Sequence, residues 1–313
     1  MDCLEIIIPT YNRKEHLTRT LTQLTAQESP VRDLSITVLD NASTDGSAEV
    51  IAQFVARYKN IKHIRHPRNI GGNANITRAF EIACAPYVWV VCDDDSFRWE
   101  SWGEIQTALE SNIYDCLLTR KNDLKGSSDI ARIFRQCTFL PAGIYRTALI
   151  TDGVLFNMYN NIPNMFPHLA LISEIFNRKG SIFLPQGEIM DQCTFDASTG
   201  DGWYARGAKG AYLPQPTTHM FWTVGFVASL HLIQDKKLRA YILDHVGKHG
   251  FFGYIWAAFR ANYTFYDGYK LNEKIVASVL NRRQRVEFWL ACQGRKFLSL
   301  FLRKKSALND RTE

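Results

Sequence analysis

Short runs of aliphatic residues alternate with amphipathic stretches along the first hundred residues, and no other feature constrains the fold as strongly. The alternation predicts a sheet of mainly parallel strands, because parallel neighbours need crossover helices between them. The expected strands are 4–8, 34–39, 61–64 and 87–91. Each predicted crossover helix has one apolar face. These faces are Leu17, Leu21 and Leu24; Val50, Ile51, Phe54 and Val55; and Ile76, Phe80 and Ala83.

The chain after residue 95 shows weaker periodicity but still separates into segments. The pattern predicts helices at 102–109 and 169–176, strands at 116–120 and 181–184, and loops at 121–130 and 196–216. From Thr218 onward the pattern is helical. We therefore expect an α/β domain over residues 1–217, divided near residue 100, and a helical region over residues 218–313.

Composition excludes several classes of protein. With 313 residues and 46% hydrophobic content, the chain can bury a substantial core, so disorder is not expected. The net charge of +6 is modest and comes without a nucleic-acid-binding motif, so we expect no nucleic-acid partner. Seven scattered cysteines without a CxxC pair argue against a disulfide framework and favour a reducing compartment. We recognise neither a secretory leader nor a membrane-spanning run, so a cytoplasmic location is expected.

Polar residues follow each of the four predicted strands. In an open parallel sheet, ligands bind at the carboxyl ends of strands, so these residues are expected to converge on one edge. They are Pro9, Thr10, Tyr11, Asn12 and Arg13 after the first strand; Asp40 to Asp45 after the second; Arg68, Asn69, Ile70, Gly71 and Gly72 after the third; and Asp93, Asp94 and Asp95 after the fourth.

The triple aspartate at 93–95 poses a charge problem. Three adjacent carboxylates behind a buried strand repel one another unless a cation neutralises them. Carboxylate oxygens favour Mg²⁺ or Mn²⁺ over zinc, and such an ion could neutralise a nucleoside-diphosphate leaving group. The alternative is a solvated turn or a run of helix-capping residues.

Single residues at the other strand ends have two interpretations each. Asp40 could accept hydrogen bonds from a nucleobase or a ribose hydroxyl, or it could simply start a turn. Asn69 and the following glycines could let the backbone approach a ligand, or form an ordinary turn. Arg13 and Arg68 could face phosphates or be solvated surface charges.

Taken in order, these segments resemble family 2 glycosyltransferases. The resemblance rests on Ile6 to Arg13, Val38 to Ser47, Asn69 to Gly72, and Asp93 to Asp95. It implies the Rossmann-like GT-A fold, with a nucleotide-binding half over 1–100 and an acceptor-side half over 101–217. Asn41 and Ala42 depart from the commoner Asp-Asp-Gly-Ser form of the second motif.

The resemblance also implies roles for individual residues. Asp93 and Asp95 would form the DxD motif and bind Mn²⁺ or Mg²⁺, with Asp94 pointing away, and His219 would complete the metal shell unless it is a packed core residue. The predicted donor-binding residues are Pro9, Thr10, Tyr11, Asn12, Arg13, Asp40, Asn69, Gly71, Asn75, Asp93, Asp94 and Asp95.

A general base is needed as well, because similar enzymes invert the anomeric centre in one displacement. The family usually places a carboxylate before a helix here, and the matching position holds His168. Histidine has a suitable unperturbed pKa, but a structural His168 is an equal alternative. Glu174, Asp191 and Asp152 are the other candidates.

Basic and aromatic residues alternate between 281 and 305, from Arg282 and Trp289 to Lys305. This pattern suits an interfacial helix on anionic lipid, which would place the protein on the inner face of the plasma membrane. The alternative is a helix packed on the catalytic domain with a solvated basic face.

We therefore expect an inverting, metal-dependent transferase. It would move a sugar from a nucleoside diphosphate, with UDP as the expected nucleotide, to a hydroxyl of a glycan or lipid-linked acceptor in cell-surface polysaccharide synthesis. The alternatives are a nucleotidyltransferase and a non-catalytic carbohydrate- or membrane-binding protein on the same scaffold. The chain lacks the Gly-rich phosphate loop with a basic catalytic residue that the former requires after the first strand.

Overall fold

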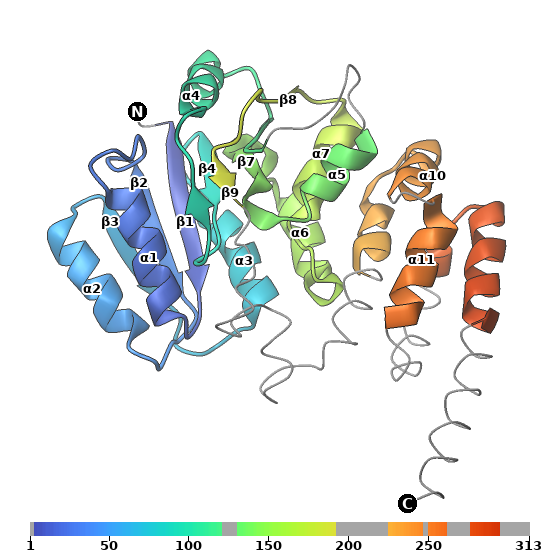
Figure 1. The fold of residues 1–313 in the computed structure, drawn as a ribbon, viewed down its shortest axis with the longest axis horizontal. Coiled ribbons are helices and arrows are strands. Elements are labelled where there is room, and N and C mark those ends of the chain that lie inside the picture. Colours follow the sequence, from blue (N-terminus) through green and yellow to red (C-terminus); the bar gives the residue numbers. More distant parts are fainter. Residues whose placement is uncertain (1–2, 121–129, 192–224, 247–249, 262–275, 295–313) are drawn as a thin grey trace, which may run out of the picture. The chain divides into compact units, whose positions relative to one another are not determined.

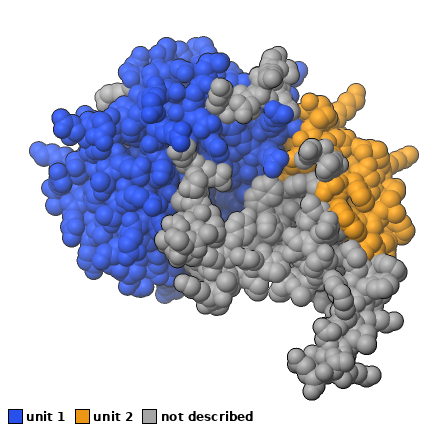
Figure 2. Space-filling model, viewed as in Figure 1, with its two compact units in different colours: residues 1–194 blue, residues 195–313 orange. Residues whose placement is uncertain are grey.

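The computed structural model describes residues 3–120, 130–191, 225–246, 250–261 and 276–294. The chain forms two compact units, Met1–Thr194 and Phe195–Glu313 (Figure 2). The boundary that we predicted at residue 217 falls outside the described residues, as do the predicted loop at 196–216 and residues 121–129 of the loop predicted at 121–130. Residue 130 is described and is helical.

Unit 1 is an α/β domain (Figure 1). Its strands are β1 (Leu4–Thr10), β2 (Ser35–Asp40), β3 (Ile61–Arg65), β4 (Tyr87–Val90), β5 (Ser96–Phe97), β6 (Cys116–Leu118), β7 (Gly143–Arg146), β8 (Ile182–Phe183) and β9 (Met190–Asp191). Its helices are α1 (Lys14–Thr25), α2 (Ser47–Arg57), α3 (Gly72–Glu81), α4 (Trp102–Ser111), α5 (Ile130–Gln136), α6 (Asp152–Asn160) and α7 (Leu169–Arg178). Single 3-10 turns lie at Leu140–Ala142, Thr147–Leu149 and Ile162–Asn164.

The central sheet has seven strands in the order β3-β2-β1-β4-β7-β6-β8. Strands β1 to β4 are parallel, whereas β7 runs antiparallel to both of its neighbours, β4 and β6. The predicted mainly parallel sheet is therefore confirmed. The chain runs outward from β1 through β2 to β3 and then returns to the opposite side of β1 as β4. Such a reversal opens a crevice at the carboxyl ends of β1 and β4, where open α/β sheets bind ligands.

Alternation along the strands divides the core between the two faces of the sheet. Ile6 and Ile8 of β1 and Trp89 of β4 belong to a buried cluster with Leu17 and Leu21 of α1. On the opposite face, α3 packs against β1 and β4. Parallel strands covered on both faces read as unbroken apolar runs, which is why the sequence Ile6 to Ile8 lacks polar alternation.

Two of the predicted apolar helix faces need correction. Val55 of α2 is 37% exposed, because α2 packs beside β3, the edge strand, and its outer side is left uncovered. In α3 the buried positions include Asn75 and Phe80, whereas Ile76 is only half-buried. A polar side chain can occupy the core side of α3 because it is hydrogen-bonded there.

The described part of unit 2 is helical, as predicted. It contains helical residues 225–229, 276–279 and 282–294, a 3-10 turn at Leu230–Leu232, and helices α10 (Lys236–His245) and α11 (Gly250–Ala261). Among the described residues, none of the helices combines the length and the apolar character needed to cross a bilayer.

Candidate active site

The loops that follow β1, β2 and β4 meet at one edge of the sheet. The backbone amide of Asn41 donates to the carbonyl of Thr10 over 2.9 Å, and that of Asn12 donates to the Ser43 hydroxyl over 3.0 Å. The Thr10 hydroxyl in turn donates to an Asp93 carboxylate oxygen over 2.7 Å. Three of the predicted strand ends are thus joined by direct hydrogen bonds at this edge of the sheet.

Asp40 is fully buried at the end of β2. One of its oxygens accepts from the backbone amide of Ser43 over 2.8 Å. Its second oxygen lies 3.4 Å from Nε of Arg65 and 3.6 Å from Nε2 of His63, and it has no hydrogen-bond partner among the described residues. This carboxylate is positioned by the loop and keeps acceptor capacity for a ligand.

The loop after β3 is tied to the β2 loop through two amide side chains. Asn41 donates to the Asn69 side-chain oxygen over 2.8 Å and accepts from the amide of Ile70 over 2.9 Å. Asn69 also accepts from the amide of Gly71, whose φ of +90° only glycine adopts readily. Ala42 has a φ of +64° at the position where the commoner family motif has glycine, and its side chain therefore adds strain of about 1 kcal/mol.

The other predicted donor-binding residues differ in how far they are buried and in whether their polar atoms are already hydrogen-bonded. Pro9 and Tyr11 are half-buried. Asn12 uses its side-chain oxygen to accept from the amide of Thr44. Asn75 is buried, donates to the carbonyl of Leu39 and lies 2.9 Å from the His66 ring, so its polar atoms hold loops together. Donor binding by these residues stays a prediction.

The three aspartates after β4 differ in their partners. Asp93 accepts from Thr10 and lies 3.1 Å from the guanidinium of Arg13, which also pairs closely with Asp94. One Asp95 oxygen accepts from the amide of Cys92 over 2.7 Å, whereas the other is buried without a hydrogen-bond partner among the described residues.

Electrostatics at this loop follow from burial. Burial raises the pKa of Asp93 to about 6, although Arg13 and the Thr10 hydrogen bond oppose the shift. Burial and then the charge of Asp94 raise the pKa of Asp95 well above its usual value, against the Cys92 hydrogen bond. The protein alone therefore leaves these carboxylates short of positive charge.

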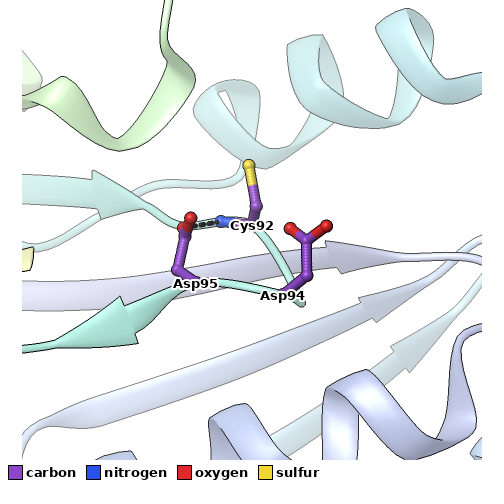
Figure 3. Close-up of side chains that lie close together, drawn as sticks. All are labelled: Cys92, Asp94 and Asp95. Carbon is purple, nitrogen blue, oxygen red and sulfur yellow. Dashed lines mark hydrogen bonds between the residues drawn. The ribbon is translucent and has the colours of Figure 1, made fainter. Parts of the chain in front are cut away.

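Metal-ligand atoms come together at Cys92, Asp94 and Asp95, all within 4.8 Å of one another. Figure 3 shows that they come from the short loop between β4 and β5. The unpartnered Asp95 oxygen and the two hard carboxylates fit a divalent cation. Asp94 lies beside Asp95 here instead of pointing away, while Asp93 is engaged by Thr10 and Arg13. Asp93 and Asp95 as the metal pair stays a prediction, and His219 lies outside the described residues.

Residues of α1 hold the aspartate loop in place, and sequence reasoning did not single them out. The Thr20 hydroxyl donates to the carbonyl of Asp93 over 2.9 Å, and the Gln23 amide donates to the carbonyl of Asp95 over 3.5 Å. A signal was present, because Thr20 is a polar residue beside Leu21 on the buried side of α1. Cys92, the third member of the group with Asp94 and Asp95, was also missed.

The candidate bases lie in different surroundings. His168 is buried, and its Nε2 lies 2.9 Å from the carbonyl of Cys137. Burial lowers its pKa to about 4. Glu174 pairs with Arg178 along the outer side of α7. Asp152 begins α6. By contrast, Asp191 of β9 is the register partner of Ser96, the residue directly after Asp95. Backbone pairing therefore brings Asp191 to the aspartate loop.

A mainly parallel sheet with carboxylates at its topological switch point defines the class: an α/β protein with an acidic candidate site at the sheet edge where such folds bind ligands. The profile of glycosyl transferase family 2 matches residues 5–178. The chain therefore belongs to this family. The fold is the GT-A fold of the glycosyltransferases.

Curated relatives agree with the family. The abequosyltransferase RfbV of Salmonella typhimurium is 30% identical over 198 residues, which are 62% of this chain and 56% of RfbV. The poly(ribitol-phosphate) beta-N-acetylglucosaminyltransferase TarS of Staphylococcus aureus is 25% identical over 48% of this chain and 29% of its own length. The chain thus spans only part of these relatives.

Solved structures of glycosyltransferases share the fold. One is S. aureus TarS 1–349 in complex with UDP-GlcNAc, with a TM-score of 0.56 and 14% identity, covering 94% of this chain and 91% of that one. The second is the mannosyltransferase PcManGT from Pyrobaculum calidifontis in complex with GDP-Man and Mn²⁺, with a TM-score of 0.55 and 13% identity, covering 96% and 86%.

Proposed function

We propose that the protein is an inverting glycosyltransferase that moves a sugar from UDP to a hydroxyl of a glycan or lipid-linked acceptor of a cell-surface polysaccharide. The observation that carries the proposal is the junction of the loops after β1, β2 and β4, together with the Asp95 carboxylate oxygen that is buried without a hydrogen-bond partner among the described residues. The names of RfbV and TarS support a sugar-transfer role. Nothing in the family assignment favours the nucleotidyltransferase alternative.

The β2 end would bind the nucleoside. The second oxygen of Asp40 can accept an N–H of a base such as the uracil imide, and the neighbouring side chains of Arg65 and His63 orient it. A solved relative with UDP-GlcNAc and another with GDP-Man show that this fold accepts either base. We favour UDP because TarS, whose solved structure is a complex with UDP-GlcNAc, is also a sequence relative of this chain.

Asp94 and Asp95, with Cys92 nearby, would hold Mn²⁺ or Mg²⁺. When bound, the ion supplies positive charge to the diphosphate as it leaves. The acceptor oxygen attacks the anomeric carbon, the bond from that carbon to the diphosphate oxygen breaks, and a carboxylate takes the hydroxyl proton. The β5–β9 pairing favours Asp191 for this last role.

A thermal-shift screen tests the donor. We expect UDP-sugars with Mn²⁺ to raise the melting temperature by several degrees, since a ligand at 100 times its Kd stabilises by about 2.7 kcal/mol. The same sugars with EDTA should have little effect. GDP-sugars with Mn²⁺ serve as the matched control. Stabilisation by GDP-sugars alone would overturn UDP as the nucleotide, and stabilisation by no nucleotide sugar would count against the transferase.

We also propose that unit 2 binds an anionic membrane surface. Val286, Trp289 and Leu290, in helical residues 282–294, are 57%, 57% and 49% exposed. The exposed Arg282 lies in the same segment. Apolar side chains beside cationic ones match the interface of an anionic bilayer, where aromatic rings enter the headgroup layer.

Vesicle sedimentation tests this membrane proposal. Replacing Trp289 by Glu should weaken binding to phosphatidylglycerol vesicles about tenfold, because it exchanges an inserted ring for a repelled charge. The Ile113→Glu variant is the control, since Ile113 is 63% exposed in unit 1. Equal binding of wild type to phosphatidylcholine vesicles, or equal loss in both variants, would contradict the proposal.

A further inference from the structure

The side chain of Arg13 is mostly buried, which the sequence around it does not predict. Arg13 is the residue between the β1 loop and α1, yet its side chain is only 14% exposed because it turns in toward the aspartate loop. Nη1 lies 3.1 Å from an Asp93 oxygen, and Nη2 donates to Asp94. Burial lowers the pKa of the guanidinium, but Asp93 and Asp94 outweigh this effect and the pKa is raised. One planar cation thus bridges two carboxylates.

Charge is unevenly shared within the triplet. Arg13 supplies one positive charge to Asp93 and Asp94, and no ion pair to Asp95 exists among the described residues. Arg19 is nearby on α1, but it donates to the backbone carbonyl of Asp94 and is exposed. The metal-free site is therefore partly neutralised by a protein cation.

Asp94 takes part both in the ion pair with Arg13 and in the candidate metal site. It is the partner of Arg13, and it is also a member of the Cys92, Asp94 and Asp95 group whose ligand atoms lie within 4.8 Å. A divalent cation in that group would place a second positive charge beside the guanidinium, which is unfavourable in a poorly solvated site. A guanidinium and a cation on the same carboxylate repel each other, so each weakens the other's contact with Asp94.

We propose that Arg13 is an internal counter-ion that competes with the divalent cation for Asp94. In the metal-free protein it holds Asp93 and Asp94 together; cation binding transfers Asp94 from the guanidinium to the ion. Arg13 is thereby a positioning residue that sets the affinity and selectivity of the site for cations. The inference rests on the proposed function only in assuming that a divalent cation is bound here.

The test measures Mn²⁺ binding to the full chain by isothermal titration calorimetry, without nucleotide, alongside thermal unfolding in EDTA. Arg13→Met keeps much of the side-chain volume and removes the charge. We expect it to bind Mn²⁺ about tenfold more tightly than wild type, because a competing charge is gone. It should also melt at a lower temperature in EDTA, because Asp93 and Asp94 then lose their counter-ion.

Opposite directions for affinity and stability separate this role from a merely structural one. If Arg13 only shaped the loop, Arg13→Met would lose both stability and Mn²⁺ binding. Arg19→Met is the matched control, since it removes a nearby charge from α1 without breaking an ion pair to a carboxylate, and it should leave the Mn²⁺ affinity within about twofold.

Arg13→Lys keeps the proposal testable if Arg13→Met does not fold. Lysine is a point charge that cannot bridge two carboxylates in the same way, so we expect Mn²⁺ binding about threefold tighter than wild type. Unchanged or weaker Mn²⁺ binding in the folded variants would overturn the proposal. Absence of Mn²⁺ binding to wild type would also overturn it, and sugar transfer that persists in EDTA would then show that the proposed function stands without it.

Discussion

Replacing Asp95 by Asn is expected to abolish sugar transfer while making the metal-free protein more stable. Asp95 is 1% exposed, and one of its carboxylate oxygens has no hydrogen-bond partner among the described residues. Without a cation, the buried charge of Asp95 destabilises the folded protein. Neutral Asn should therefore raise the free energy of unfolding by about 1–3 kcal/mol. Loss of a metal-bound carboxylate should lower kcat by about 10³-fold, because the ion supplies several kcal/mol to the leaving group.

The measurements are initial rates with saturating Mn²⁺ and urea unfolding in EDTA. Asparagine can still accept from the amide of Cys92, so the loop should keep its shape. Asp115→Asn is the control: that carboxylate is half-buried, accepts from the amide of Ser181 over 2.9 Å and lies outside the aspartate loop. It should lose stability and retain transfer. A fully active Asp95→Asn variant would exclude Asp95 as a metal ligand.

The second large loss of activity is expected on replacing Asp191. Its backbone pairs with Ser96, directly after Asp95, and general bases typically contribute about 10²–10⁴-fold to rate. Asp191→Asn should therefore lower kcat by about 10³-fold and leave the Kd for UDP with Mn²⁺ nearly unchanged, because Asn can neither take the proton nor disturb the nucleotide. Pre-steady-state transfer and calorimetry of UDP binding would separate the two quantities.

Glu174→Gln and His168→Gln complete this comparison. Glu174 is already paired with Arg178 on α7, so its loss should change kcat less than threefold. His168 is 2% exposed against the Cys137 carbonyl, and its replacement should reduce stability more than kcat. A large loss of kcat in His168→Gln, with Asp191→Asn fully active, would return the role of base to His168.

Much of the secondary structure of unit 1 was predictable, because the hydrophobic periodicity that marks each strand and helix is a local property of the sequence. The predicted strand at 34–39 became β2, Ser35–Asp40, and the helix at 169–176 became α7, Leu169–Arg178. Parallel pairing then follows from the crossovers, and convergence of the strand ends follows from parallel pairing. Predicting that β7 runs antiparallel between β4 and β6 was beyond reach, because Gly143–Arg146 is short and its pairing depends on partners far along the chain.

The sequence by itself determined the GT-A architecture and the edge of the sheet at which Asp40 and the triple aspartate stand. Only the tertiary structure decided which side chains contact one another at that edge: Arg13 pairs with Asp93 and Asp94, and Asp94 lies beside Asp95. The physical reason is the separation along the chain of the residues that make these contacts. Periodicity reports which residues share a face within one element, whereas the Arg13–Asp94 contact joins atoms 81 residues apart, and its geometry depends on how every intervening strand packs.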